Sequence, residues 1–185
     1  MLSRTGIGQG CMRDTLVPRA VRIGGMDKRE LLQALRDHKV QMNQAAEVLF
    51  DDRRFTLLSQ RKVIQTAFLS VADLGFEEGA TYQQLTARAL ESGFVECPLE
   101  LGPHLRVQFP NQPEASVGSA TTQHRAPPGS ITVASPPLDN SDQTPRGFYL
   151  RRIDGVLWLR GYWSWPGHIW SPEDVLVFSR GGSAV

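Results

Sequence analysis

The chain has little of several features that mark particular classes of protein. Of its 185 residues two are cysteines, Cys11 and Cys97, which is too few for a disulfide framework and favours a reducing cytoplasm. No run of about eighteen apolar residues occurs, so we expect no membrane span and no membrane partner. Charge of one sign is not in excess either, because 20 Lys and Arg against 19 Asp and Glu leave a formal net charge of +1. This balance supplies no overall field for a polyanion, so any polyanion must bind locally.

Phosphate-binding loops and closely spaced metal ligands are also missing. No G-x-x-x-x-G-K-[ST] segment is present, and Gly6-Ile7-Gly8-Gln9-Gly10 neither follows a strand pattern nor matches G-x-G-x-x-G. Specific zinc sites pair cysteines or histidines at tight spacing, which this sequence does not do. We therefore expect no cofactor and no metal site.

Glycine and apolar periodicity divide the chain into parts. Residues 1–25 are rich in glycine and have no sustained apolar period, so we expect them to be a disordered leader. The whole composition, 41% hydrophobic and 21% charged, is that of an ordinary globular protein. We expect one domain over residues 26–180, with a helical part at 26–96 and a β-rich part at 97–180.

The helical part is predicted to contain about four helices. The first begins at a capping box of Asp27 and Glu30, and the second covers residues 43–50. The third runs from Ser59 to Gly75, and the fourth begins at a capping box of Thr81 and Gln84. The last two, joined by a glycine-containing turn, leave a helix-turn-helix open as an alternative to a plain helical layer packed on a sheet.

The β-rich part shows alternating apolar residues at several places. These are residues 105–109, 130–134, 147–162 and 175–178. Helices first and strands second predict an α+β fold, in which an N-terminal helical layer packs on a mainly antiparallel sheet with a C-terminal β-hairpin.

The hairpin at residues 147–162 is the clearest local signal. Asp154-Gly155 suits a two-residue type I′ turn, which would pair Ile153 with Val156 and set the register of both strands. One face then carries apolar side chains. The other carries Tyr149 opposite Arg160 and Arg151 opposite Trp158, pairs that suit cation–π contact.

Short motifs accompany the hairpin elsewhere in the chain. They are Cys97-Pro98-Leu99-Glu100, Gly102-Pro103-His104-Leu105-Arg106, Thr122-Gln123-His124 and Ala126-Pro127-Pro128-Gly129-Ser130-Ile131-Thr132. With the hairpin, they resemble a group of short bacterial proteins that have no established activity and are sometimes labelled helicase. The resemblance spans about residues 26–178 and implies a shared fold and extent but no reaction. A helicase motor is not expected, because the phosphate-binding loop is missing and a typical motor needs two nucleotide-binding domains.

The aromatic and arginine residues of the hairpin are the best candidates for a binding site. All four tryptophans lie in or just after it, and every cationic side chain after residue 103 is an arginine. We expect an exposed platform that binds an anionic planar ligand, a nucleic-acid strand or an acidic protein partner. The ligand-binding candidates are Tyr149, Arg151, Trp158, Arg160, Tyr162 and Arg106.

Three alternatives remain open at this point. The tryptophans are core residues or a dimer seam, with the arginines lying over them. Alternatively, the chain is a small hydrolase or transferase whose site, under the loop at residues 110–129, is formed by Cys97, Glu100, His104, Arg106 and His124. The last alternative is an interaction protein that forms a homodimer through the hairpin edge.

Overall fold

The computed structural model describes residues 17–114 and 126–181. Its elements in chain order are β1 (Arg19–Ile23), α2 (Lys28–Asp37), β2 (Gln41–Met42), α3 (Gln44–Asp51), β3 (Lys62–Ser70), β4 (Ala80–Thr81), α4 (Tyr82–Glu91), β5 (Phe94–Val95), α5 (Leu101–Gln108), β6 (Ile131–Val133), β7 (Gly147–Ile153), β8 (Val156–Tyr162), β9 (Ile169–Trp170) and β10 (Val175–Arg180). None of these helices is long and apolar enough to cross a bilayer.

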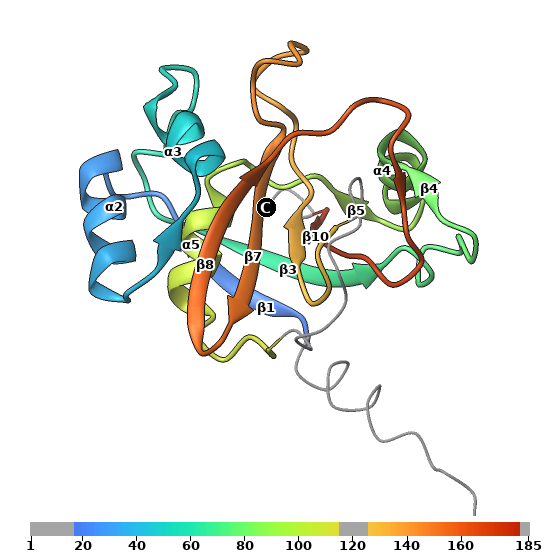
Figure 1. Ribbon diagram of the computed structural model, residues 1–185, viewed down its shortest axis with the longest axis horizontal. Coiled ribbons are helices and arrows are strands. Elements are labelled where there is room, and N and C mark those ends of the chain that lie inside the picture. The colour runs from blue at the N-terminus through green and yellow to red at the C-terminus, as the bar shows by residue number, and fades with distance from the viewer. Residues whose placement is uncertain (1–16, 115–125, 182–185) are drawn as a thin grey trace, which may run out of the picture.

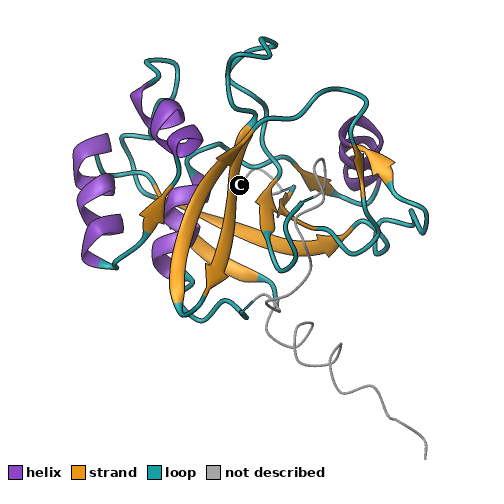
Figure 2. Ribbon diagram, in the orientation of Figure 1, coloured by secondary structure: helices purple, strands orange, loops and turns teal. Residues whose placement is uncertain are grey.

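Most strands join one 8-stranded sheet in the order β1-β3-β10-β6-β7-β8-β2, with β5 paired to β10. Only the pairs β6–β10 and β2–β8 are parallel. Strands β4 and β9 form a separate antiparallel pair. Figure 1 shows α2, α3 and α5 on one side of the molecule and α4 on the other, and Figure 2 shows the long hairpin strands crossing the direction of β1 and β3. The predicted α+β fold with a mainly antiparallel sheet is confirmed.

The hairpin has the predicted turn and register. Asp154 and Gly155 both have positive φ, 49° and 77°, as a type I′ turn requires. Arg151 pairs with Trp158, and Tyr149 pairs with Arg160. A local turn therefore sets which side chains share a face.

Three of the four expected helices are also confirmed, and the capping boxes predicted for two of them form. Capping boxes join Asp27 to Glu30 at α2 and Thr81 to Gln84 at α4. The side chain of Asn43 accepts a hydrogen bond from the amide of Ala46 at the start of α3.

The helix predicted from Ser59 to Gly75 is wrong, because most of this segment is strand β3. Its apolar residues recur at steps of three and four, but Val63, Ile64 and Thr66 are β-branched and favour extended backbone. The strand pairs with β1 on one side and β10 on the other. The helix-turn-helix alternative fails with it, since its first helix does not exist.

The strand predicted at residues 105–109 is also wrong, because this segment belongs to helix α5. Leu101, Leu105 and Phe109, four residues apart, are all fully buried, which is a helical spacing. Gly102 lets the helix approach the sheet, because a Cβ there would lie 2.7 Å from the Cβ of Phe148.

Part of the expected leader is ordered structure. Residues 1–16 lie outside the described part of the chain, but β1 pairs with β3 along its whole length and buries Val21 and Ile23. The expected boundary at residue 25 is therefore wrong, because β1 supplies an edge of the sheet.

The two faces of the sheet are covered by different helices. On the first face, Val133, Leu150 and Val177 pack with α2, α3 and α5 in the larger core. On the second face, Leu176 and Phe178 pack with Leu85 and Ala89 of α4 in a smaller core. Tyr162 of the hairpin packs against this smaller core, whereas Arg151, Trp158 and Arg160 on the same face are half-buried.

Candidate functional site

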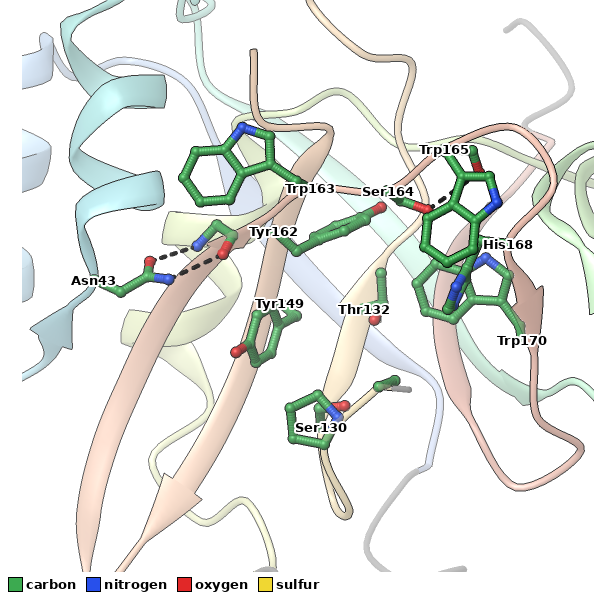
Figure 3. A pocket seen from close by; sticks show the side chains of 13 residues that line it. Asn43, Ser130, Thr132, Tyr149, Tyr162, Trp163, Ser164, Trp165, His168 and Trp170 are labelled. Atoms are coloured by element: carbon green, nitrogen blue, oxygen red, sulfur yellow. Dashed lines mark hydrogen bonds between the residues drawn. The ribbon is translucent and has the colours of Figure 1, made fainter. Parts of the chain in front are cut away.

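A cleft of about 330 Å³ opens on the second face, where the hairpin meets the loop that follows it. Its lining residues are mostly aromatic or hydroxyl-bearing: Asn43, Ala126, Pro127, Ser130, Thr132, Tyr149, Gly161, Tyr162, Trp163, Ser164, Trp165, His168 and Trp170. We call this the hairpin cleft. Figure 3 shows Trp165, His168 and Trp170 gathered on one side, with Tyr149 and Trp163 toward the other and Tyr162 between them.

One wall of the hairpin cleft is held by the start of α3. The side-chain amide of Asn43 donates to the carbonyl of Gly161 at 3.0 Å, and the Gly161 amide donates to Asn43 Oδ1 at 2.8 Å (Figure 3). A Cβ at Gly161 would lie 2.6 Å from the carbonyl carbon of Ala45, so only glycine permits this approach. Asn43 thus caps α3 and continues the edge pairing of β8.

The rings of the hairpin cleft form a continuous set of contacts. Centroid distances are 6.4 Å from Tyr149 to Tyr162, 5.9 Å from Tyr162 to Trp170, 5.1 Å from Trp170 to His168 and 5.2 Å from His168 to Trp165. Such edge-to-face contacts hold rings in fixed orientations. Trp163 and Trp165 nevertheless remain 52% and 48% exposed, while Trp170 is buried. The cleft therefore has an ordered floor and exposed indoles at its rim.

Arginine side chains adjoin the hairpin cleft through Tyr149. The guanidinium of Arg160 lies 5.2 Å from the ring centre of Trp158 and 6.0 Å from that of Tyr149. Within residues 17–114 and 126–181, no carboxylate lies within ion-pair distance of Arg151 or Arg160. The Nε atoms of both are buried and have no hydrogen-bond partner in the described part of the chain. We call Tyr149, Arg151, Trp158 and Arg160 the arginine platform.

The two tyrosines of the hairpin cleft are held in the neutral form. Burial raises the pKa of Tyr149, and the nearby charges of Arg160 and Arg151 oppose this rise only in part. Burial also raises the pKa of Tyr162, and the negative charge of the Glu96 carboxylate raises it further. Both phenols therefore serve as neutral hydrogen-bonding groups at physiological pH.

The predicted ligand-binding residues are brought together with one exception. Tyr149 and Tyr162 line the hairpin cleft, and Arg151, Trp158 and Arg160 lie half-buried beside it. Arg106 is fully buried on α5, where it donates to the side chain of Gln112 and to the carbonyl of Phe109. Burial and the charge of Arg152 lower its pKa to about 10. Because residue 106 lies on a helix facing the sheet and not on a strand, its guanidinium is not presented to a ligand.

The residues predicted for an enzyme site are buried on the first face. Glu100 accepts from the amide of Leu58 at 3.1 Å, and His104 Nε2 accepts from the amide of Gly24 at 3.2 Å. The two side chains approach to 3.5 Å. These bonds connect α5 to the backbone of the preceding segments, which is a structural use of both groups.

Cys97 and His124 do not complete an enzyme site in the described structure. Cys97 is buried, burial raises the pKa of its thiol to about 12, and its Sγ contacts the carbonyl of Val177 at 3.5 Å. His124 lies outside the described residues. Residues 17–114 and 126–181 contain no group of three or more His, Cys, Asp or Glu side chains arranged to hold a metal ion.

The edge that a hairpin-mediated dimer would use is partly occupied. Trp158 and Leu159 of β8 pair with β2, and Gly161 bonds Asn43. A second chain would have to displace these contacts to add a strand there.

Sequence reasoning missed the parts of the cleft that come from distant elements. Asn43 lies 87 residues before Ser130, and Thr132 lies 31 residues before Trp163, the first tryptophan that lines the cleft. The alternation at residues 130–134 was the one signal in the sequence, because it places Thr132 of β6 and Ser130, just before that strand, on the same side.

Comparison of the chain with protein-family models, curated proteins and solved structures finds no match in any of the three. The proposal below therefore depends on the geometry of the hairpin cleft and the arginine platform.

Proposed function

We propose that the protein binds single-stranded nucleic acid, with one base in the hairpin cleft and the adjoining phosphates on the arginine platform. The observation that carries this proposal is the position of Arg160, which stacks on Trp158 and Tyr149 and has no carboxylate partner among the described residues. Its charge is therefore available to an anion.

The chemistry of the two adjoining surfaces supports a nucleotide-containing ligand. Proteins that bind single strands combine aromatic side chains, on which bases stack, with cationic groups that contact the phosphates. Trp163 and Trp165 are exposed rings at the rim, and Ser130 and Thr132 supply hydroxyls that can bond a base edge. A volume of about 330 Å³ is near the lower end for small-ligand sites, which suits one base and not a longer planar ligand.

The balanced net charge agrees with a local site of this kind. A formal charge of +1 gives the chain no overall positive field of the kind that favours binding of duplex DNA through many phosphates. We expect weak, salt-dependent binding of a short single strand.

The test is titration of a fluorescently labelled oligothymidylate, followed by anisotropy. Arg160→Ala should weaken binding by about tenfold and reduce its salt dependence by about one phosphate contact. Trp163→Ala should also weaken binding by about tenfold, through loss of stacking, without changing the salt dependence. A parallel titration with adenosine monophosphate distinguishes a strand from a single nucleotide.

The matched control is Arg29→Ala, which removes an exposed arginine of α2 far from the cleft in the chain. It should leave binding unchanged. Equal losses for Arg29→Ala and Arg160→Ala would mean that binding is nonspecific. No binding of either probe by the folded wild-type protein would overturn the proposal.

A further inference from the structure

A second cleft of about 340 Å³ lies on the other side of the loop aromatics. It shares Tyr162, Ser164, Trp165 and Trp170 with the hairpin cleft and adds Tyr82, Gln83, Thr86, Glu96, Ser135, Pro136, Pro137, Arg146 and Pro166. We call it the Glu96 cleft. The proposed nucleic-acid site shares the wall that contains Trp165 but does not use Glu96, Tyr82 or Arg146.

The walls of the Glu96 cleft are aromatic on several sides. The ring of Tyr82 lies 6.4 Å from that of Trp170, which in turn lies 5.9 Å from Tyr162. Trp165 is about half exposed and lines the opening. Faces of Trp and Tyr rings attract cations, and cages of such rings are the usual sites for quaternary ammonium groups.

The carboxylate of Glu96 gives this cleft a negative charge. Glu96 is half-buried, and its Oε1 accepts a hydrogen bond of 2.7 Å from the hydroxyl of Tyr82. No Lys, Arg or His among the described residues lies within ion-pair distance of it. Burial is the main cause that raises the pKa of both Tyr82 and Tyr162, and the charge of Glu96 also raises both. The same charge therefore acts on two of the rings.

Among the described residues, Arg146 is the cation that lines the Glu96 cleft, and it is held by neighbouring loop segments. Arg146 donates from Nε to the carbonyl of Ser164 at 3.1 Å and from Nη1 to the carbonyl of Asp139 at 3.4 Å, and its Nη2 lies 3.8 Å from Asp142. These contacts direct its donors to the segments before β7 and after β8, so the guanidinium forms no ion pair with Glu96, although its charge also acts on Tyr162.

We infer that the Glu96 cleft binds an organic ammonium ion, of the alkylated type, between the rings of Tyr82, Tyr162, Trp165 and Trp170 and against the Glu96 carboxylate. Ser135 and Trp170 line the same cleft, and their Oγ and Nε1 atoms are buried with no hydrogen-bond partner among the described residues. The cleft is larger than a tetramethylammonium ion, so the natural ligand carries the ammonium on a longer molecule.

The experiment is a calorimetric titration of the full chain with tetramethylammonium, choline and benzyltrimethylammonium. The uncharged tert-butyl analogue of choline is the matched neutral probe. Saturable binding of at least one cation, with at least tenfold weaker binding of the neutral analogue, is expected from a cation–π site.

Variants test the role of the carboxylate. Glu96→Gln keeps an oxygen that can accept from Tyr82 but removes the charge, and it should weaken cation binding by about tenfold. Glu47→Gln removes an exposed charge of α3 and should have no effect. Trp165→Ala, which changes a half-exposed loop residue, should also weaken cation binding. It replaces Glu96→Gln as the test if that variant does not fold.

The outcomes separate this inference from the proposed function. Equal binding of the neutral analogue, or unchanged cation binding in a folded Glu96→Gln variant, would show a merely apolar cleft and overturn the inference. Failure of all three cations to bind would overturn it as well. Arg160→Ala should leave cation binding unchanged, and Glu96→Gln should leave oligothymidylate binding unchanged, so either site can fail alone.

Discussion

The two faces of the sheet differ in how far their charged side chains are bonded within the chain. On the first face Glu100, His104 and Arg106 are buried, and each makes a hydrogen bond to a backbone group of the same chain. On the second face, no hydrogen bond or ion pair to another described residue satisfies the guanidinium groups of Arg151 and Arg160. Arg106 Nε and Glu100 Oε2 on the first face also lack a partner among the described residues, but the other polar atoms of these two side chains are bonded within the chain. A half-buried guanidinium that has no such bond is suited to an anionic ligand.

The largest expected difference between the faces is in stability. Phe148→Ala on the first face removes a ring in contact with Phe50 and Phe55, at centroid distances of 5.7 Å and 5.8 Å. It should lower the free energy of unfolding by about 3–5 kcal/mol. Trp163→Ala on the second face should change it by less than about 0.5 kcal/mol. Urea denaturation measures both, and a large loss for Trp163→Ala would assign that indole to packing.

Arginine substitutions on the two faces should separate folding from binding. Arg106→Leu leaves the buried Gln112 side-chain oxygen and the Phe109 carbonyl without their donor, and should destabilise the fold by about 1–3 kcal/mol. It should leave oligothymidylate affinity unchanged. Arg160→Leu should do the reverse, with a small effect on unfolding and a clear loss of affinity. The contrast between the faces is wrong if both variants change the same property.

Alkaline pH should destabilise the protein through the second face. All three tyrosines, Tyr82, Tyr149 and Tyr162, have a pKa raised above 10.0, chiefly by burial. An unfolded tyrosine loses its proton near pH 10, whereas the folded chain retains it, so the free energy of unfolding falls as pH rises above about 10. Tyrosinate absorbance should appear together with the loss of circular dichroism. Ionisation near pH 10 in a protein that stays folded would show that the rings are open to water.

The smallest effect is expected from thiol reagents on the first face. In a Cys11→Ser variant Cys97 is the single thiol, and with a pKa of about 12 it is almost wholly protonated at neutral pH. Alkylation should be negligible until denaturant is added. Rapid alkylation of the folded variant would restore the enzyme alternative that includes Cys97.

Features formed by residues close together in the chain could be predicted from the sequence. The Asp154-Gly155 turn and the capping boxes of Asp27 and Thr81 involve atoms only a few residues apart, so their geometry follows from local sterics and hydrogen bonding. Once the turn is known, strand periodicity of two places Tyr149, Arg151, Trp158 and Arg160 on one face.

Distant contacts decided the rest. Residues 62–70 carry apolar side chains at spacings that suit a helix as well as a strand, and pairing with β1 and β10, which lie far away in the chain, selects the strand. Residues 101–108 alternate in part yet form a helix, because Leu101 and Leu105 are buried against the sheet. Tertiary structure alone joined Asn43 to Gly161 across 118 positions and placed Glu96 among the rings of its cleft. Local interactions join residues a few positions apart in the sequence, whereas a cleft requires burial shared by segments that meet only after the chain has folded.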